Sequence, residues 1–304
     1  MGEHHHNHDH SHSSLKGKNL FISIALNLGI SIAQTIGGIL SGSIALLSDA
    51  LHNFSDVLSL CISYIAHRLA ARKFTTRYTF GLQRAEILAA FINSAVLMGI
   101  AIYLGFEAVD RMMHPHDIHS MTVVWLAFAS IVVNGLSVLL IKSDAKKSIN
   151  IKSAYLHLFT DMLTSIAVLA GGLLMKFYGI YWIDGLITLL IACYLIYSSW
   201  HLFVESINII MLCSPGKIDI QKLTSKIESV EGVKNLHHLH LWLLTDNQIN
   251  MEAHIDLMED SPVSEFEKQL EQIQTIAHEM GIDHVTIQPE FINNDDKSLI
   301  HQHR

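Results

Sequence analysis

The sequence is poor in charge and in cysteine. Only 16% of its 304 residues are charged and 50% are hydrophobic, whereas about 25% charge is usual for a soluble domain. The composition is therefore that of a membrane protein. Three widely spaced cysteines without a CxxC pair indicate no disulfide framework. The formal net charge of −8 is concentrated after Glu228, which argues against nucleic acid as a partner.

Six apolar stretches are each close to the ~20 residues that a helix needs to cross a bilayer. They lie at residues 19–40, 44–66, 83–107, 121–142, 153–175 and 181–204. Lysine and arginine gather between the second and third stretches and between the fourth and fifth, so the positive-inside rule places both termini in the cytoplasm. We expect a six-helix transmembrane domain at 19–212, surrounded by lipid in the cell (plasma) membrane.

The pattern after this domain is that of a soluble fold. Residues 213–291 predict the order α-β-β-α-β, a small sheet with helices on one face. The helices are expected at 216–230 and 262–280, and the strands at 233–243, 248–258 and 283–290. Residues 292–304 are predicted to form a flexible tail.

The first 18 residues are too polar to build a core and are expected to form a disordered cytoplasmic tail. Six of the chain's 21 histidines lie there, at His4, His5, His6, His8, His10 and His12. Three consecutive histidines fit an expression tag, whereas the interspersed Asn7, Asp9 and Ser11 favour a native tail that collects metal.

Two His-x-x-x-Asp motifs inside apolar stretches are the strongest functional signal. His52 and Asp56, like His157 and Asp161, are four residues apart, so both side chains of a pair project from one helix face. Two such helices side by side offer two nitrogens and two oxygens to one ion, a tetrahedral set that Zn²⁺ accepts. An Asp at the centre of a membrane helix costs ~2.5–3.5 kcal/mol and usually marks an ion path. The alternative is a buried structural hydrogen-bond network.

Asp49 lies on the same helix face as His52 and Asp56, nearer the outer end. Such a stripe favours an exit path for the ion, and an anchor of the helix at the interface is the alternative. The two motif-bearing stretches are separated by two others, so they run antiparallel. Both motifs then reach the middle of the membrane through their carboxylates, which makes one shared midplane site the hypothesis.

Longer runs of sequence carry a family resemblance. Residues 43–52, residues 78–88 and the second His-x-x-x-Asp motif closely resemble the cation diffusion facilitator family, within it the bacterial zinc–cadmium–cobalt exporters. Segments 236–242 and 284–290 resemble the cytoplasmic domain of that family. The resemblance implies six membrane helices, a ferredoxin-like cytoplasmic domain and a homodimer. It also implies export of Zn²⁺, with Cd²⁺ and Co²⁺ as further substrates, in exchange for protons by alternating access. The implied transport site is His52, Asp56, His157 and Asp161.

The resemblance implies further metal sites in the cytoplasmic domain, where Zn²⁺ acts as a regulator. The matching positions are His237, His254 and Glu290, while Gln288 stands where the family often has histidine. Simple strand alternation instead makes His238 and His240 the neighbours of His254, unless a β-bulge brings His237 onto that face. Surface histidines without a metal are the alternative.

Two other classes of protein compete with a transporter. A membrane metalloenzyme needs an open coordination position and a catalytic acid or base, and we expect neither an enzyme nor an organic cofactor. A metal sensor or storage protein would use the histidine-rich tail and the acidic domain, but it would not need six spans with buried ligands. The sequence therefore favours transport.

Overall fold

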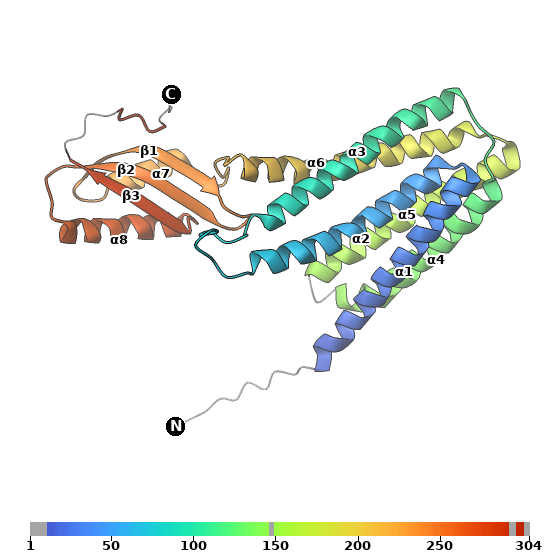
Figure 1. Ribbon diagram of the computed structural model, residues 1–304, viewed down its shortest axis with the longest axis horizontal. Coiled ribbons are helices and arrows are strands. Elements are labelled where there is room, and N and C mark those ends of the chain that lie inside the picture. The colour runs from blue at the N-terminus through green and yellow to red at the C-terminus, as the bar shows by residue number, and fades with distance from the viewer. Residues whose placement is uncertain (1–10, 146–148, 292–295, 301–304) are drawn as a thin grey trace. The chain divides into compact units, whose positions relative to one another are not determined.

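The computed structural model describes residues 11–145, 149–291 and 296–300 (Figure 1). Six long helices come first, α1 (Ser11–Ser41), α2 (Ile44–Ala70), α3 (Ala85–Met113), α4 (Ser120–Ala145), α5 (Ile149–Tyr178) and α6 (Trp182–Ile210). The chain divides into two compact units. One holds the chain up to Ile62 together with Ile92–His201, and the other holds Ser63–Phe91 together with the chain from Leu202 onward.

Four helical segments are long and apolar enough to cross a membrane, namely Ala85–Met113, Ser120–Leu140, Tyr155–Tyr178 and Trp182–Ile210. A shorter apolar segment, Ala25–Ser41, belongs to α1. These findings confirm the predicted helical transmembrane domain.

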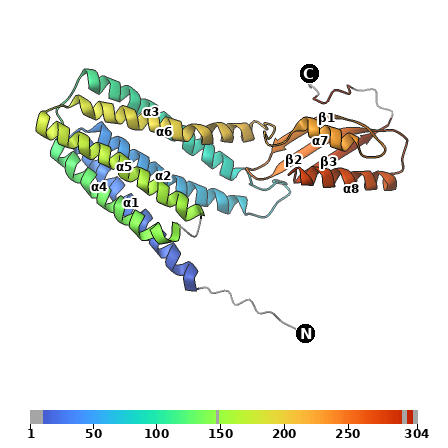
Figure 2. The same ribbon diagram turned by 180° about the vertical axis from the view of Figure 1, so that it is seen from behind.

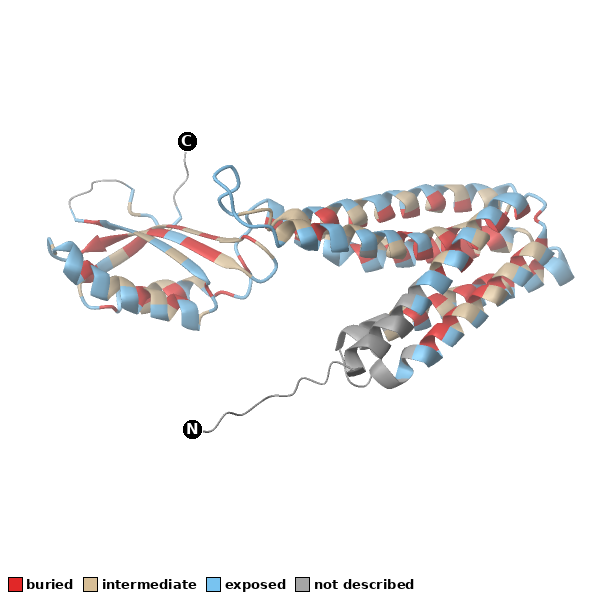
Figure 3. Cartoon of the chain, turned by 60° about the horizontal axis from the view of Figure 1, so that its bottom comes forward, coloured by how far each residue is buried: buried red, intermediate tan, exposed pale blue. Residues whose placement is uncertain are grey.

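The outer faces of these helices carry large apolar side chains. Phe106 is 75% exposed and Tyr197 is 83% exposed, and exposed residues run along the helices in Figure 3. A surface of this kind is unfavourable in water and suits contact with lipid chains.

The N-terminal boundary differs from the expectation. Helix α1 already begins at Ser11, so residues 11–18, predicted to be disordered, are helical. Residues 1–10, with most of the histidine-rich tail, lie outside the described residues. Polar composition lowers the tendency to form a core, but it does not prevent a helix from extending beyond its apolar part.

Close approach of neighbouring helices depends on glycine. A Cβ on Gly38 of α1 would lie 3.1 Å from the backbone of Leu47 in α2, and a Cβ on Gly172 of α5 would lie 3.1 Å from the side chain of Val124 in α4. Both distances are tighter than ordinary contact, so a larger residue would push the helices apart. Helices α4 and α5 lie side by side in both views (Figures 1 and 2).

A carboxylate from α6 caps the start of α2. Asp184 accepts hydrogen bonds from the backbone N–H groups of Ile44 at 2.8 Å and Ala45 at 3.3 Å, and from the hydroxyl of Ser43. The first N–H groups of a helix have no partner within the helix and attract negative charge. Asp184 is itself buried, so this cap fixes the beginning of the helix that carries the first motif.

We expect Asp184→Ala to lower the free energy of unfolding by about 2–4 kcal/mol, because it leaves buried helix N–H groups without an acceptor. Thermal unfolding of the detergent-solubilised protein measures the loss. Asp110→Ala is the matched control, since its side chain is 57% exposed and contacts only His114 among the described ion pairs. Equal melting temperatures for the two variants would contradict the capping role.

The second unit contains the α+β domain. Its elements are α7 (Ile220–Glu228), β1 (Val233–Leu243), β2 (Ile249–Leu257), α8 (Val263–Glu279) and β3 (His284–Glu290). The strand order is β1-β2-β3, with β1 and β2 antiparallel and β2 and β3 parallel. The parallel pair requires a crossover, which α8 provides. The predicted order α-β-β-α-β is confirmed.

One apolar core joins the two helices of this domain to the sheet. It includes Leu223 and Ile227 of α7, Ile273 of α8, and Met251 and Ile255 of β2, all fully buried. The alternation in β2 therefore has the expected cause, since the apolar side chains face the helices and the opposite face is left for polar groups.

Candidate metal centres

The two His-x-x-x-Asp motifs come together between α2 and α5. His52 Nε2 lies 3.5 Å from Asp161 Oδ1, and His157 Nε2 lies 3.2 Å from Asp56 Oδ2. Each histidine therefore faces the aspartate of the other motif. This crossing follows from the antiparallel direction of the helices, because residue i of one helix is level with residue i+4 of the other.

Contacts within each motif complete the cluster. His52 Nδ1 lies 3.6 Å from Asp56 Oδ2, and His157 Nε2 lies 3.6 Å from Asp161 Oδ2. Ligand atoms of His52, Asp56 and Asp161 all lie within 4.8 Å of one another, and His157 adjoins the two carboxylates. The transport-site residues expected from the sequence thus form one cluster, which we call the membrane cluster.

The spacing of the membrane cluster suits a small tetrahedral cation. Ligand atoms ~2.0–2.1 Å from a tetrahedral Zn²⁺ lie about 3.3 Å from one another. With one atom taken from each residue, three contacts measure 3.2–3.6 Å, and they join His52 Nδ1, Asp56 Oδ2, His157 Nε2 and Asp161 Oδ2. Both ring nitrogens of His52 and both carboxylate oxygens of Asp161 are buried without a hydrogen bond. Buried polar atoms need a partner, and a divalent cation would supply one for a single ring nitrogen of His52 and for the carboxylate of Asp161.

Burial within the membrane cluster is uneven. The side chain of Asp161 is 0% exposed and that of His52 is 7% exposed, whereas Asp56 is 24% and His157 is 40% exposed. Protein atoms therefore enclose Asp161 and His52, whereas Asp56 and His157 lie on the more exposed side of the cluster.

Asp49 does not belong to the membrane cluster. Its carboxyl group is fully buried and accepts hydrogen bonds from Gln34 Nε2 at 2.8 Å, Thr164 Oγ1 at 2.8 Å and Ser165 Oγ at 3.0 Å. Ser165 also contacts Ser130 of α4 at 2.9 Å. These contacts join α1, α2, α4 and α5 one helical turn from His52 and Asp161. Asp49 thus holds the motif-bearing helices together, and its proposed role in an exit path has no contact that tests it.

A second cluster, the cytoplasmic cluster, consists of His237, His254 and Glu290. His237 Nε2 lies 3.2 Å from Glu290 Oε2, and His254 Nδ1 lies 2.9 Å from Glu290 Oε1. Ligand atoms of the three residues all lie within 4.8 Å of one another. Two imidazoles and one carboxylate are a ligand set suited to Zn²⁺. Gln288 is not a ligand here but donates a hydrogen bond to Glu290 at 3.0 Å.

A β-bulge decides which histidine of β1 enters this cluster. His237 pairs with His254 and His240 pairs with Glu252, so one extra residue stands between the two pairs on β1. His238 takes up the extra length with a φ of 52°, an uncommon value for a residue with a side chain. His237 is therefore fully buried against His254. Regular alternation along β1 would have placed His237 on the opposite face of the strand from His254.

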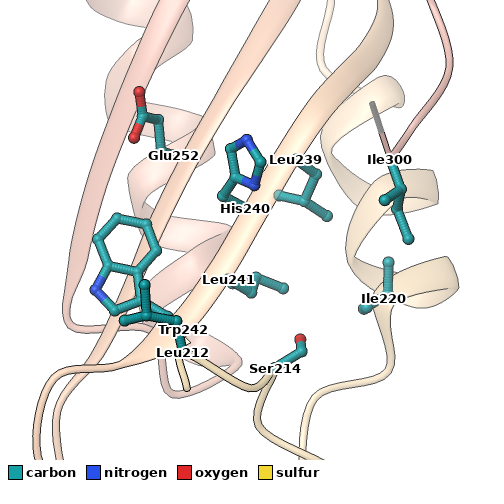
Figure 4. Close-up of a pocket in the computed structure, with 9 residues that line it drawn as sticks. All are labelled: Leu212, Ser214, Ile220, Leu239, His240, Leu241, Trp242, Glu252 and Ile300. Carbon is teal, nitrogen blue, oxygen red and sulfur yellow. The ribbon is translucent and has the colours of Figure 1, made fainter. Parts of the chain in front are cut away.

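The other two histidines of β1 lie beside the cytoplasmic cluster. The centroid of the His238 ring lies 4.5 Å from the ring centroid of His254 and 5.3 Å from that of His240. His240 lines a neighbouring cavity together with Glu252 (Figure 4). Of the described residues, His237, rather than His238 or His240, joins His254 and Glu290 as a group of close ligand atoms.

Two residues of this region were not predicted from the sequence. Lys297 Nζ lies 2.8 Å from Glu290 Oε2 and 2.9 Å from Asp256 Oδ1. Asp256 was detectable, since it has the same strand parity as His254 and pairs with Glu290 across the sheet. Lys297 gave no signal, because it follows the last strand in a segment predicted to be flexible. In the structure, Ser298 and Leu299 of this segment accept backbone hydrogen bonds from β1.

The histidine-rich tail contributes no described contact. His4, His5, His6, His8 and His10 lie outside the described residues, and the side chain of His12 is also not described. A metal-collecting role for these six residues remains an expectation from the sequence.

Comparison with known families and proteins agrees with the division into a helical transmembrane domain and an α+β domain. Residues 20–211 match the family model for the cation efflux transmembrane domain, and residues 215–291 match that for the cytoplasmic domain of cation efflux proteins. The two matches meet at the boundary between the helices and the α+β domain.

Related proteins are similar over nearly the whole chain. A cadmium, cobalt and zinc/H(+)-K(+) antiporter of Bacillus velezensis is 37% identical over 94% of this chain and 92% of its own length. The metal cation efflux system protein CzcD of Cupriavidus metallidurans is 35% identical over 90% of this chain and 86% of its own. The zinc transporter ZitB of Escherichia coli is 30% identical over 90% of this chain and 87% of its own length.

Proposed function

The chain belongs to the cation efflux family, and from this premise we propose that it exports Zn²⁺ from the cytoplasm in exchange for protons. Cd²⁺ and Co²⁺ are further candidate substrates, as the names of the relatives suggest. The observation that carries the proposal is the crossed pairing of two histidines and two aspartates in the membrane cluster, with contacts of 3.2 and 3.5 Å between the motifs.

The ligand types support a transition metal. Imidazole suits zinc, cobalt and nickel, whereas sites made of oxygen alone suit magnesium, calcium and manganese. The membrane cluster holds both kinds of ligand in equal number, and both histidines of the motifs are present. We therefore expect Zn²⁺ to be preferred over Mg²⁺ and Mn²⁺.

Proton exchange follows from the same groups. Imidazole and carboxylate bind a metal only when they are deprotonated, so binding of Zn²⁺ releases protons and protonation releases Zn²⁺. Alternating access then requires that the membrane cluster opens first to the cytoplasm and later to the outside. The greater exposure of His157 and Asp56 supports one open side, and no covalent step or organic cofactor is needed.

Membrane voltage constrains the exchange. Each elementary charge moved across 100 mV is worth ~2.3 kcal/mol. Exchange of one Zn²⁺ for one proton moves one net positive charge outward, against the usual potential. Export therefore draws on the pH gradient or on more than one counter-ion.

We place the protein in the plasma membrane, with both termini in the cytoplasm and lipid around α1–α6. The match of residues 215–291 to the cytoplasmic domain of cation efflux proteins supports a homodimer, because that family model describes a dimerisation domain. The cytoplasmic cluster is proposed to bind regulatory Zn²⁺ through His237, His254 and Glu290.

Reconstituted vesicles test the transport proposal. With equal Zn²⁺ on both sides and an acidic lumen, protons leaving through the protein are expected to drive Zn²⁺ into the lumen above the outside concentration. A zinc-sensitive dye and a pH-sensitive dye in the lumen report both fluxes. A protonophore, which collapses the pH gradient, is expected to prevent the accumulation. In vesicles that start without luminal Zn²⁺, uptake that stops at equal concentrations, with or without the pH gradient, would identify a channel instead.

A further inference from the structure

The side chain of Lys297 extends into the cytoplasmic cluster. Its Nζ lies 2.8 Å from Glu290 Oε2, 2.9 Å from Asp256 Oδ1 and 3.2 Å from His237 Nε2. An ammonium group has three N–H donors and no acceptor. The ammonium therefore donates to Glu290 Oε2 and Asp256 Oδ1, and His237 Nε2 lies within hydrogen-bond distance of the same group.

Two of the three atoms beside the ammonium are also candidate metal-binding atoms. His237 Nε2 and Glu290 Oε2 are atoms of the proposed metal ligands, and both face Nζ within hydrogen-bond distance. One lone pair cannot bind an N–H group and a metal ion together, and the two positive charges repel each other at this distance. Lys297 and a metal ion therefore exclude each other at this place.

The lysine is fixed there by the segment around it. Leu239 N–H donates a hydrogen bond to Leu299 O at 2.8 Å, and His238 N–H donates one to Ser298 O at 3.2 Å. Ile300 lines a cavity of about 420 Å³ with Leu239 and Ile220, and the three side chains lie on the same side of this cavity in Figure 4. Residues 296–300 are thus attached beside the β1 bulge at several points.

We propose that residues 296–300 are an intramolecular competitor for metal, with the ammonium of Lys297 in place of the ion in the cytoplasmic cluster. A divalent cation that binds His237, His254 and Glu290 displaces Lys297 and weakens the attachment of the segment to β1. In the metal-free protein, the ammonium neutralises part of the negative charge of Glu290 and Asp256. It also raises the metal concentration that is needed to fill the cytoplasmic cluster. The inference rests on the proposed metal site.

Metal affinity tests the competition. Zn²⁺ binding is titrated on the full-length chain carrying Asp161→Asn. This substitution is expected to weaken Zn²⁺ binding at the membrane cluster, so that the titration reports mainly on the cytoplasmic cluster. Lys297→Gln is expected to raise the affinity of the cytoplasmic cluster by about tenfold or more, because charge-assisted hydrogen bonds no longer oppose binding. Lys222→Gln, which removes an exposed lysine of α7, is the matched control and is expected to leave the affinity unchanged. An unchanged or lower affinity in Lys297→Gln would overturn the competition.

Hydrogen exchange tests the displacement in the chain with Lys297 intact. The amides of His238 and Leu239, protected by Ser298 and Leu299, are expected to exchange several-fold faster once Zn²⁺ is bound. The same protection with and without bound zinc would refute displacement, whatever the folding of any Lys297 variant.

A third variant separates the site from its competitor. Glu290→Gln is expected to remove one equivalent of bound Zn²⁺ from the Asp161→Asn chain. If the equivalent is lost in Glu290→Gln but neither affinity nor exchange depends on Lys297, the metal site stands and the competition fails. If Glu290→Gln binds as much Zn²⁺ as its parent, the proposed cytoplasmic site fails and the competition with it.

Discussion

Replacing Asp161 by asparagine is expected to lower zinc-driven proton flux in reconstituted vesicles by about 100-fold or more, since even indirect partners of metal ligands contribute 10–100-fold to affinity. Asp161 is the most enclosed ligand of the membrane cluster, and both histidines face its carboxylate. Asparagine keeps the size of the side chain but removes the charge, and a neutral amide is a poor ligand for Zn²⁺. Luminal pH and zinc dyes measure the loss.

The control for this variant is Asp246→Asn, which changes an exposed carboxylate in the turn between β1 and β2. It is expected to keep the flux of the unsubstituted protein. The elution volume on gel filtration and the melting temperature show whether Asp161→Asn is folded and assembled. A folded Asp161→Asn protein with unreduced flux would reject the membrane cluster as the transport site.

Replacing Asp49 by alanine is expected to lower the free energy of unfolding by about 2–4 kcal/mol. The carboxyl group accepts three hydrogen bonds, but two of the donors have another acceptor nearby. Thr164 also donates to the carbonyl oxygen of Asp161 at 2.9 Å, and Ser165 can donate to Ser130. The main cost is therefore the buried amide of Gln34, which loses its acceptor. Thermal unfolding in detergent measures the effect.

Asp49→Asn distinguishes the two roles considered for this residue. If Asp49 only joins helices, the asparagine variant keeps one acceptor oxygen and its flux per folded protein is close to that of the unsubstituted chain. If Asp49 lies on an exit path for the ion, the same variant remains folded but its Zn²⁺ flux falls several-fold. Flux measured at matched amounts of folded protein separates these outcomes.

The membrane cluster was predictable because its pattern is local. A four-residue spacing inside an apolar stretch places a histidine and an aspartate on one helix face whatever the rest of the chain does. Finding two such motifs on antiparallel stretches then leaves few arrangements other than His52 beside Asp161 and His157 beside Asp56. The strands were predictable for a similar reason, since alternation in β2 requires only one apolar and one polar face.

The roles of other residues depend on contacts that have no regular spacing. Asp49 and Asp184 each look like polar residues near a helix end, and only the packing of α1, α5 and α6 shows which donors they meet. The start of α1 at Ser11 was likewise missed. Composition describes whether a segment can form a core, but not whether its backbone continues a neighbouring helix.

By itself, the sequence determined the six long helices, the order of the α+β domain and the four residues that meet in the membrane cluster, because each follows from a repeat of 3.6 or two residues along the chain. Only the tertiary structure decided that His237 enters the cytoplasmic cluster and that Lys297 reaches it. A bulge shifts the strand's alternation by one residue, and the lysine comes from a segment outside every element, so neither contact obeys a local period.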